Sequence, residues 1–421
     1  MAGGKLKKLC FKSKFWALSF WFLGCSFWGA AQNHDYIWYY GWSNETSHPD
    51  FAGGTIVFRH NPPRAWPQRR PVNLARYGHI LTDSLGLSVL YYSNGLHIYN
   101  RQDQVMENGD TINPGYFWQL SYPQPYIYSA SGLSVPYPGR PDEYLYFHQR
   151  FDSLNVPPNC CWFPRDIYYS HIDMSANDGL GRVVSKNNTV YADYSSSFGL
   201  TKTGDNRGWW LVFGALRSNI FYTYVVDSLG VSLHRIDTLG GNIYEGTTLR
   251  DQPSLGGFSP DGTKFAKCDY WHGITLLDFD RCEGRLSNPR FYPVDSTNSS
   301  TSLAFSPNSR FIYYNTSSQL MQLDTWAGPD EHPLDTIANW DAYYELNMPP
   351  FSDGFAFSQL APDGKIYISA SASSRHLHVI ERPNLPGQAC GFRQHGFPLP
   401  TSNGTTVPHF PNYRLEPIDC N

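Results

Sequence analysis

The sequence lacks the short motifs that mark the common nucleophilic, phosphate-binding and zinc sites. It has no Gly-x-Ser-x-Gly nucleophile elbow and no glycine-rich phosphate loop. It also has no Cys-x-x-Cys pair and no Cys/His spacing of the kind that binds zinc. We therefore predict no catalytic, cofactor-binding or metal-ligating residues and expect no cofactor, so that an enzymatic activity has no local support.

Charged residues are scarce, at 16% of the chain, and the 36 acids outnumber the 32 bases. An acidic chain without a basic stripe is a poor match for nucleic acid as a partner. The chain also lacks low-complexity runs, which argues against disorder. Aromatic residues make up 16%, and there are 36 Gly and 31 Pro. This composition is typical of many short strands joined by turns, and it argues against a helical protein.

Long hydrophobic runs are limited to the N-terminus. Five lysines precede an apolar stretch at residues 15–28, which is too short to span a bilayer comfortably, and small residues follow up to Ala31. We predict a secretory signal peptide at residues 1–31 and an exported mature domain at residues 32–421 without a transmembrane segment. The expected location is the periplasm, the outer surface or the extracellular space. In a second interpretation Cys25 is the acylated cysteine of a lipoprotein.

An even number of cysteines remains after this cleavage, and in an exported chain such a number favours disulfide bonds. The six candidates are Cys160, Cys161, Cys268, Cys282, Cys390 and Cys420. The sequence alone does not choose their pairing. The adjacent Cys160 and Cys161 could form a strained redox pair, but two separate structural bridges are the preferred interpretation.

A repeated phrase organises the rest of the chain. It occurs at residues 258–266, 305–313 and 360–368, at intervals of roughly 50 residues. In each copy a hydrophobic residue ends a strand, Pro followed by Asp or Asn makes a tight turn, and a β-rich run begins the next strand. A repeat of this size made only of strands predicts a β-propeller with one repeat per blade.

Strand clusters predict a single all-β propeller of seven four-stranded antiparallel blades, with six or eight as alternatives. A β-sandwich array is the second candidate architecture. We expect N-terminal strands to pair with the short β-like tail at residues 408–414 and so close the ring. The clearest predicted strands are residues 36–42, 55–59, 89–92, 96–99, 143–148, 166–174, 209–213, 219–226, 231–236, 274–279, 320–323 and 377–380.

Several polar residues invite a functional interpretation, but each has a simpler structural one. Asp261 and Asp363 supply one carboxylate each, so turn chemistry explains them better than calcium. His376 and His378 alternate and share one face of a strand. They could bind a metal with a third ligand, but no third ligand is suggested nearby, and a hydrogen-bonded pair is favoured. His171 is expected to make a structural hydrogen bond on the face that it shares with Asp173.

The tryptophans and one glycine pair also have both a functional and a structural interpretation. Trp209, Trp210, Trp271, Trp326 and Trp340 could form a sugar-stacking platform, but the packed sheets of a propeller predict that most are core residues. The pair Gly256 and Gly257 is expected immediately before a strand, where close backbone packing explains it.

The motifs in combination resemble a family of exported, WD-repeat-like propeller proteins of Bacteroidetes-type bacteria. The similarity covers nearly the whole mature chain, and the segments that carry it are residues 90–95, 172–181, 273–289, 305–311, 359–367 and 408–415. Many members carry a type IX secretion sorting tail after PKD-like domains, and this chain shows neither. It also has Thr203 and Gly208 where relatives have His and Asp. The resemblance implies a fold and an exported location, and no catalytic activity.

Three functions are therefore carried forward. The first is a secreted or cell-surface binding module for a protein or glycan ligand at the propeller rim. The second is a hydrolase or lyase of extracellular polysaccharide, which would need converging acids or histidines at the central channel. The third is a structural component of an envelope or secretion assembly.

Overall fold

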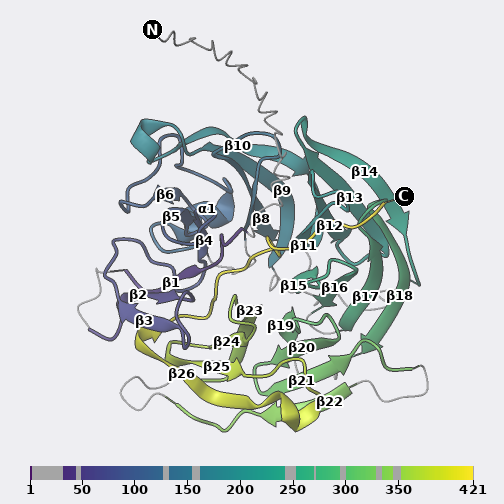
Figure 1. The fold of residues 1–421 in the computed structure, drawn as a ribbon. Helices are drawn as coiled ribbons and strands as arrows, with labels where there is room; N and C mark the ends of the chain where they lie inside the picture. Colours follow the sequence, from purple (N-terminus) through teal and green to yellow (C-terminus); the bar gives the residue numbers. More distant parts are fainter. Residues whose placement is uncertain are drawn as a thin grey trace. The chain divides into compact units, whose positions relative to one another are not determined.

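The residues that the structure describes contain 26 β-strands. The computed structural model describes Met1 and residues 32–43, 49–126, 132–153, 162–241, 253–269, 272–293, 300–328, 334–344 and 352–420. These residues form a seven-bladed antiparallel β-propeller, in which five blades have four described strands and blades 1 and 2 have three (Figure 1). The predicted all-β, seven-bladed fold is confirmed. The predicted signal peptide, including Cys25, lies outside the described residues, and no described helix is long and apolar enough to cross a membrane.

The strands fall into seven sheets, one per blade. Blades 1 to 3 contain β1 (Ile37–Gly41), β2 (Gly53–Val57) and β3 (Arg64–Pro67); β4 (His79–Thr82), β5 (Val89–Ser93) and β6 (Ile98–Asn100); and β7 (Leu133–Pro136), β8 (Glu143–Ser153), β9 (Trp162–Asp173) and β10 (Arg182–Tyr191). Blades 4 and 5 contain β11 (Ser195–Lys202), β12 (Trp209–Ala215), β13 (Ile220–Asp227) and β14 (Gly230–Thr238); and β15 (Pro253–Phe258), β16 (Lys264–Asp269), β17 (Gly273–Asp280) and β18 (Arg285–Pro293).

Blades 6 and 7 complete the ring. They contain β19 (Ser300–Phe305), β20 (Phe311–Thr316), β21 (Gln319–Asp324) and β22 (Leu334–Asn339); and β23 (Phe355–Leu360), β24 (Ile366–Ala370), β25 (Ser374–Ile380) and β26 (Phe392–Asn403). Helical structure among the described residues is limited to α1 (Tyr116–Ser121) and two 3₁₀ turns, η1 (Asn177–Gly179) and η2 (Gly387–Cys390).

The repeated phrase forms the same turn in blades 5, 6 and 7, between the first and second strands of each sheet. In each turn a backbone N–H donates to the carbonyl three residues earlier, from Gly262 to Ser259 (2.8 Å), Ser309 to Ser306 (2.9 Å) and Gly364 to Ala361 (3.0 Å). The donor residue has a left-handed φ in all three turns, at 69°, 61° and 79°. This backbone region favours glycine, so the Gly of the first and third copies is the residue that the turn requires.

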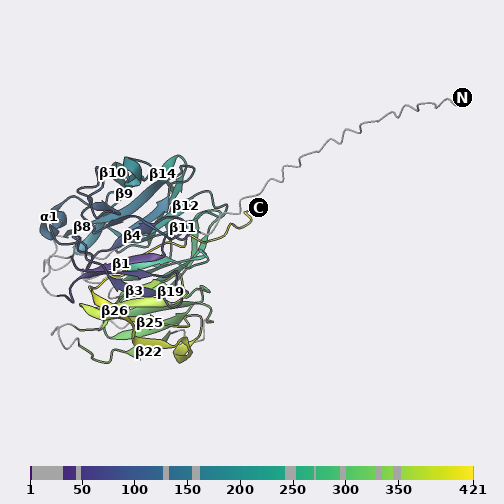
Figure 2. The same cartoon turned by 60° about the vertical axis from the view of Figure 1, so that its left-hand side comes forward.

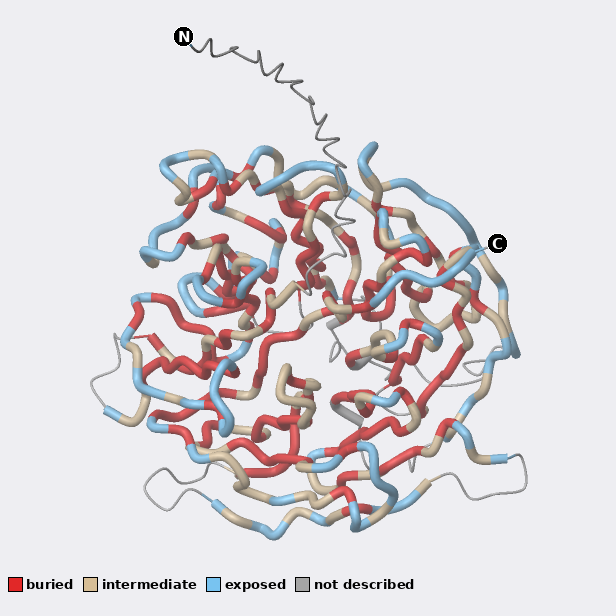
Figure 3. Tube along the Cα trace, viewed as in Figure 1, coloured by how far each residue is buried: buried red, intermediate tan, exposed pale blue. Residues whose placement is uncertain are grey.

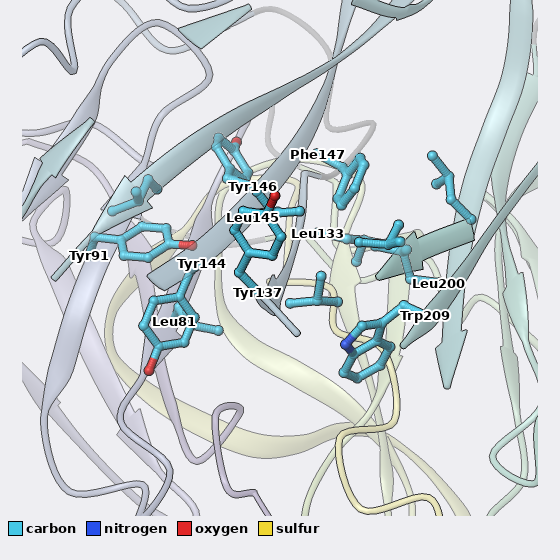
Figure 4. Close-up of a cluster of buried hydrophobic side chains, with 14 of the residues drawn as sticks. Leu81, Tyr91, Leu133, Tyr137, Tyr144, Leu145, Tyr146, Phe147, Leu200 and Trp209 are labelled. Atoms are coloured by element: carbon cyan, nitrogen blue, oxygen red, sulfur yellow. The ribbon is translucent and has the colours of Figure 1, made fainter. Parts of the chain in front are cut away.

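Burial follows the distance of a strand from the ring axis. The first strands of the blades are largely buried, whereas outer strands such as β14 and β18 carry most of the exposed positions (Figure 3). The largest core cluster lies between blades 2, 3 and 4, where Tyr91, Tyr146 and Phe147 pack toward Leu200 and Trp209 (Figure 4). Large residues of these strands are therefore buried in clusters between neighbouring blades, as sheet-on-sheet packing requires.

The chain ends meet differently from the prediction. Blade 1 is built from the N-terminal strands β1–β3, and blade 7 from β23–β26, without a mixed sheet of N- and C-terminal strands among the described residues. Strands β3 and β26 lie side by side as neighbouring blades (Figures 1 and 2). The tail beyond β26, predicted to be β-like, forms no strand. Instead of adding a strand to a blade, the tail crosses the ring (Figure 1).

Candidate functional site

The C-terminal tail, residues 404–420, crosses the ring from blade 7 toward blades 4 and 5 (Figure 1). It starts where Thr405 N–H donates to the carbonyl of Ala75 (2.8 Å). Further along, Asn412 Nδ2 donates to the carbonyl of Pro260 in the repeated turn of blade 5 (2.7 Å). Tyr413 is fully buried, and its hydroxyl donates to the carbonyl of Ser134 in blade 3 (2.7 Å). The tail is therefore attached to several blades at once.

An ion pair fixes the middle of the tail. The guanidinium of Arg414 makes two bonds to the carboxylate of Asp35, at 2.6 and 2.7 Å. The side chain of Asp35 is 4% exposed and that of Arg414 is 30% exposed. Two-point contact of this kind is the strongest geometry for an Arg–carboxylate pair. It connects the segment before β1 to the segment after β26, so it joins the two ends of the described propeller.

Backbone contacts and a disulfide bond hold the last part of the tail. Arg281 is buried and donates to the carbonyl of Glu416 (2.9 Å), while Ile418 N–H donates to the carbonyl of Gly204 (2.8 Å). Cys282 and Cys420 form a disulfide bond between residues 138 positions apart. The tail therefore ends as a covalent attachment to blade 5.

A central cavity of about 330 Å³ lies between the tail and the first strands of blades 3 to 7. Its walls contain the apolar side chains of Phe198, Leu200, Leu255, Phe258, Leu303 and Phe305. The tail contributes the segment from His409 to Asn412 and Arg414. The cavity has the volume at the lower end of typical small-ligand pockets, which begin at about 300 Å³.

The described lining of the cavity carries no unpaired acidic side chain. Asp35 is the only acidic side chain among the described residues that line it, and Arg414 neutralises this carboxylate. Burial lowers the pKa of His409 to about 3, so its ring is neutral at physiological pH. A pair of carboxylates at glycosidase spacing, about 5–10 Å, is not present in this wall. The cavity is large enough for a small ligand, and the described residues that line it include no pair of carboxylates.

The aspartates of the repeated turns have the structural role that was predicted for them. Asp261 Oδ1 accepts hydrogen bonds from Ser259 Oγ, Thr263 N–H and Thr263 Oγ1. Asp363 accepts from Lys365 N–H and from the hydroxyl of Tyr367. Each carboxylate therefore satisfies the polar groups of its own turn and strand.

The tryptophans divide between core and surface. Trp209 and Trp210 are buried, in agreement with the prediction. Trp340 is half-buried, whereas Trp326 is 61% exposed with the guanidinium of Arg310 above its ring at 5.2 Å. Trp271 lies outside the described residues. These rings are distributed over different blades, so those that are described do not form one sugar-stacking platform.

The glycine pair before the first repeated turn also divides. A Cβ on Gly256 would lie 2.7 Å from the carbonyl oxygen of Ala266, so close packing explains that glycine. A Cβ on Gly257 would meet no atom within 4 Å, and Gly257 lines the central cavity. The prediction of close packing is therefore wrong for Gly257, which is a place where the wall of the cavity can be changed without a collision.

His171, His376 and His378 contact residues that the sequence did not indicate. His171 Nε2 lies 2.6 Å from Glu143 Oε2, while Asp173 accepts hydrogen bonds from Ser175 instead. The rings of His376 and His378 both approach His395, at centroid distances of 5.5 and 5.4 Å. His395 and the nearby Asp353 lacked a local sequence signal, except that Gly396 inside a strand indicates a bulge.

The remaining candidate cysteines are distributed as follows. Cys268 and Cys390 are buried and lie in different blades. Cys160 and Cys161 lie outside the described residues. In the turn of blade 4, Thr203 Oγ1 donates to Asp205, so the residue that replaces the family's His has a local hydrogen-bonding role.

The comparisons with known proteins show the fold. No protein-family profile and no curated protein sequence matches the chain. Among solved structures, a Bacteroides uniformis protein whose 6-phosphogluconolactonase activity is itself only an assignment is 11% identical, with a TM-score of 0.54, over 89% of this chain and 99% of its own. The periplasmic gluconolactonase PpgL of Pseudomonas aeruginosa is 11% identical (TM-score 0.39; 82% and 78% covered).

A third solved propeller also matches the chain. The propeller domain of Cps50 (Swd1) from Myceliophteria thermophila is 8% identical, with a TM-score of 0.41, over 81% of this chain and 94% of its own. The Bacteroides uniformis structure supports a shared propeller fold, and at 11% identity it supports nothing about shared chemistry. The Bacteroidetes-type family therefore rests on the sequence resemblance alone.

Proposed function

We propose that this chain is an exported propeller that binds a ligand in its central cavity and does not transform it. The observation that carries the proposal is the wall of the cavity, in which the only acid among the described lining residues is neutralised by Arg414. A rigid ring with a preformed apolar pocket is a common basis for recognition. Because the described lining residues include no acid–base pair, the cavity is a poor match for the alternative of a polysaccharide hydrolase or lyase.

The same wall favours a protein ligand over a glycan. The lining includes large apolar residues from the first strands of several blades, together with polar residues such as Thr201, Gln359 and Asn412. A sugar brings many hydroxyl groups, and each one that is left without a partner in an apolar pocket is costly. An apolar anchor side chain of a partner protein has no such requirement. We therefore assign the cavity to an apolar anchor of a protein partner.

Export is the second part of the proposal, with residues 1–31 as the signal peptide that is removed. The disulfide bond between Cys282 and Cys420 supports it, because such bonds persist in oxidising compartments. N-terminal sequencing of the protein recovered from the producing cells checks this part. A mature N-terminus at Gln32 is expected, and a protein that retains residues 1–31 in the cytoplasm would contradict export.

The binding part is tested with substitutions at two open glycines. Gly257→Leu places a side chain in the cavity wall, while Gly241→Leu places one at an exposed site outside this cavity; neither Cβ meets an atom within 4 Å. The mature chain is screened against displayed random peptides and a glycan array. We expect peptides with apolar anchors to be enriched, and the Gly257→Leu variant alone to lose them.

Each other outcome has a definite meaning. Glycans that bind the unmodified chain and lose affinity only in Gly257→Leu would replace the protein ligand with a sugar. Peptides that bind both variants equally would show that the cavity is not the binding site. A stable complex that co-purifies with both variants would favour the structural component of an assembly.

A further inference from the structure

A second site lies in blade 7, away from the central cavity. Asp353 precedes β23, His378 lies in β25 and His395 lies in β26. One ligand-capable atom from each of these three side chains lies within 4.8 Å of the other two. Asp353 and His378 have no exposed side-chain surface, and His395 is 22% exposed. Two imidazoles and a carboxylate thus converge in the interior with one open side.

A β-bulge brings His395 into this position. Leu377 pairs with Phe397, but Val379 pairs with Arg393, so β26 contains extra residues opposite His378. His395 has a φ of 53° within this bulge, a left-handed conformation that is uncommon for a residue with a side chain. Bulges redirect side chains and are frequent beside functional sites. The strand is therefore distorted at the residue that completes the cluster.

The buried ring of His378 lies near the carboxylate of Asp353 without a hydrogen bond between its Nε2 and that carboxylate. Asp353 Oδ2 lies 2.5 Å from His395 Nδ1, whereas Asp353 Oδ1 lies 3.7 Å from His378 Nε2, beyond hydrogen-bonding distance. Nε2 of the buried His378 has no hydrogen-bond partner among the described residues. A buried ring nitrogen that lies 3.7 Å from a carboxylate oxygen, too far for a hydrogen bond, separates this cluster from an ordinary His–Asp pair.

We propose that Asp353, His378 and His395 bind a divalent transition-metal ion, with Zn²⁺ as the best match. Imidazole nitrogens suit Zn²⁺ and its neighbours, whereas Ca²⁺ and Mg²⁺ prefer oxygen ligands alone. Zinc-to-ligand distances of about 2.0–2.2 Å bring tetrahedral ligand atoms to roughly 3.4 Å from one another. The Asp353–His395 contact would lengthen and the wider separations would shorten. Three protein ligands leave a fourth position open toward the exposed edge of His395.

The surroundings of His395 match a metal-binding histidine. Its Nε2 lies 3.0 Å from Asp341 Oδ2, and Asp341 is partly exposed. A histidine that binds metal through one nitrogen commonly donates its other N–H to a carboxylate, which orients the ring. Because both nitrogens of His395 face carboxylates, coordination through Nδ1 requires that this nitrogen carries no proton.

Coordination also has a consequence for the backbone. The peptide N–H of His395 donates to Nδ1 of His378 (3.2 Å), which places the ring proton of His378 on Nε2 in the metal-free protein. A neutral ring that binds metal through Nε2 carries its proton on Nδ1 instead, so this contact must open. Metal binding through His378 therefore displaces the peptide of His395, at the residue with the left-handed φ.

The test uses the folded mature chain after treatment with a chelator. Zn²⁺ alone is titrated by calorimetry, and Co²⁺ is titrated with its visible absorption recorded. We expect one ion per chain, a tetrahedral Co²⁺ spectrum and a shift of the His395 amide resonance. Asp341→Asn is expected to weaken Zn²⁺ binding about 10–100-fold, and His395→Gln and His378→Gln are expected to abolish it.

His171→Gln is the matched control, because His171 makes a comparable pair with Glu143 but has no second imidazole in the cluster. This variant is expected to bind Zn²⁺ as the unmodified chain does. If His378→Gln does not fold, the Co²⁺ spectrum of the unmodified chain and the partly exposed His395→Gln variant still decide. An absence of Zn²⁺ binding by the folded chain, or binding that His395→Gln leaves unchanged, would overturn the metal site and leave a buried ion pair.

Discussion

The ion pair between Asp35 and Arg414 offers a direct test of the closing role of the tail. Arg414→Met keeps the length of the side chain but removes its charge, which leaves the 4% exposed carboxylate of Asp35 without its partner. Removal of one member of a buried pair costs about 3–5 kcal/mol. Because Arg414 is 30% exposed, solvent screens part of this energy, and we expect a cost near the lower end, about 3 kcal/mol.

A double-mutant cycle isolates the pair from the loss of packing. In Asp35→Asn/Arg414→Met no buried charge remains, so the double variant is expected to be more stable than the sum of the single variants predicts, by about 1–2 kcal/mol. Free energies of unfolding come from urea denaturation followed by tryptophan fluorescence, with m-values compared across the four proteins. Both changes lie on the tail contact, so the cycle reports the closure itself.

The control and the refuting result are specific. Arg285→Met removes the exposed Arg285–Glu283 pair, with side chains 48% and 58% exposed, and it is expected to leave stability nearly unchanged. The reasoning fails if Arg414→Met costs no more than Arg285→Met, or if the two single variants of the buried pair add without coupling. Either result would mean that the ring closes through the other tail contacts.

Three further predictions follow from contacts of the same fold. Cys282→Ser/Cys420→Ser is expected to lower the free energy of unfolding by about 2–4 kcal/mol; thermal melts should show the same loss when a reductant is added to the unmodified chain and no further loss in the variant. Burial lowers the pKa of His148 to about 3 from its ordinary 6.5, so the unfolded chain binds the extra proton between these values and stability falls as pH falls through this window. His148→Gln should reduce the slope of unfolding free energy against pH by up to about 1.4 kcal/mol per pH unit. His60→Gln, at an exposed position, should leave this slope unchanged. Equal slopes in the two variants would contradict a neutral buried His148. Gly256→Ala, whose Cβ would meet Ala266 O at 2.7 Å, should cost about 1–3 kcal/mol in urea denaturation, whereas Gly257→Ala should be nearly neutral, and a reversed order would refute the assigned packing.

The blades could be predicted from the sequence because their determinants are local. A Pro-Asp-Gly turn and the alternation of the following strand both act within about ten residues. The same turn appears three times, so the period of the ring was visible without any long-range contact. The helix α1 (Tyr116–Ser121) was missed, since its six residues are too short to show a helical period.

The closure of the ring and the second site could not be predicted in this way. Arg414 reaches a partner 379 residues earlier in the chain, and no periodicity encodes such a contact. His395 faces Asp353 only because β26 bulges opposite β25. The alternation of His376 and His378 predicted a shared face correctly, since both rings approach His395. The contacts of His395 and Asp353 with these rings depend on a distortion of β26, and the only local sign of this distortion in the sequence is Gly396.

The position of the tail at the end of the chain also determines that the cavity forms after the blades during synthesis. Residues 404–420 are translated after all seven blades, and they supply one wall of the central cavity. Propeller blades can begin to form while the chain is still being made, since N-terminal segments emerge first. The cavity, by contrast, exists only after the last turn of blade 7 has been passed and Arg414 has reached Asp35. A nascent or C-terminally shortened chain could thus contain every blade and still have no binding pocket.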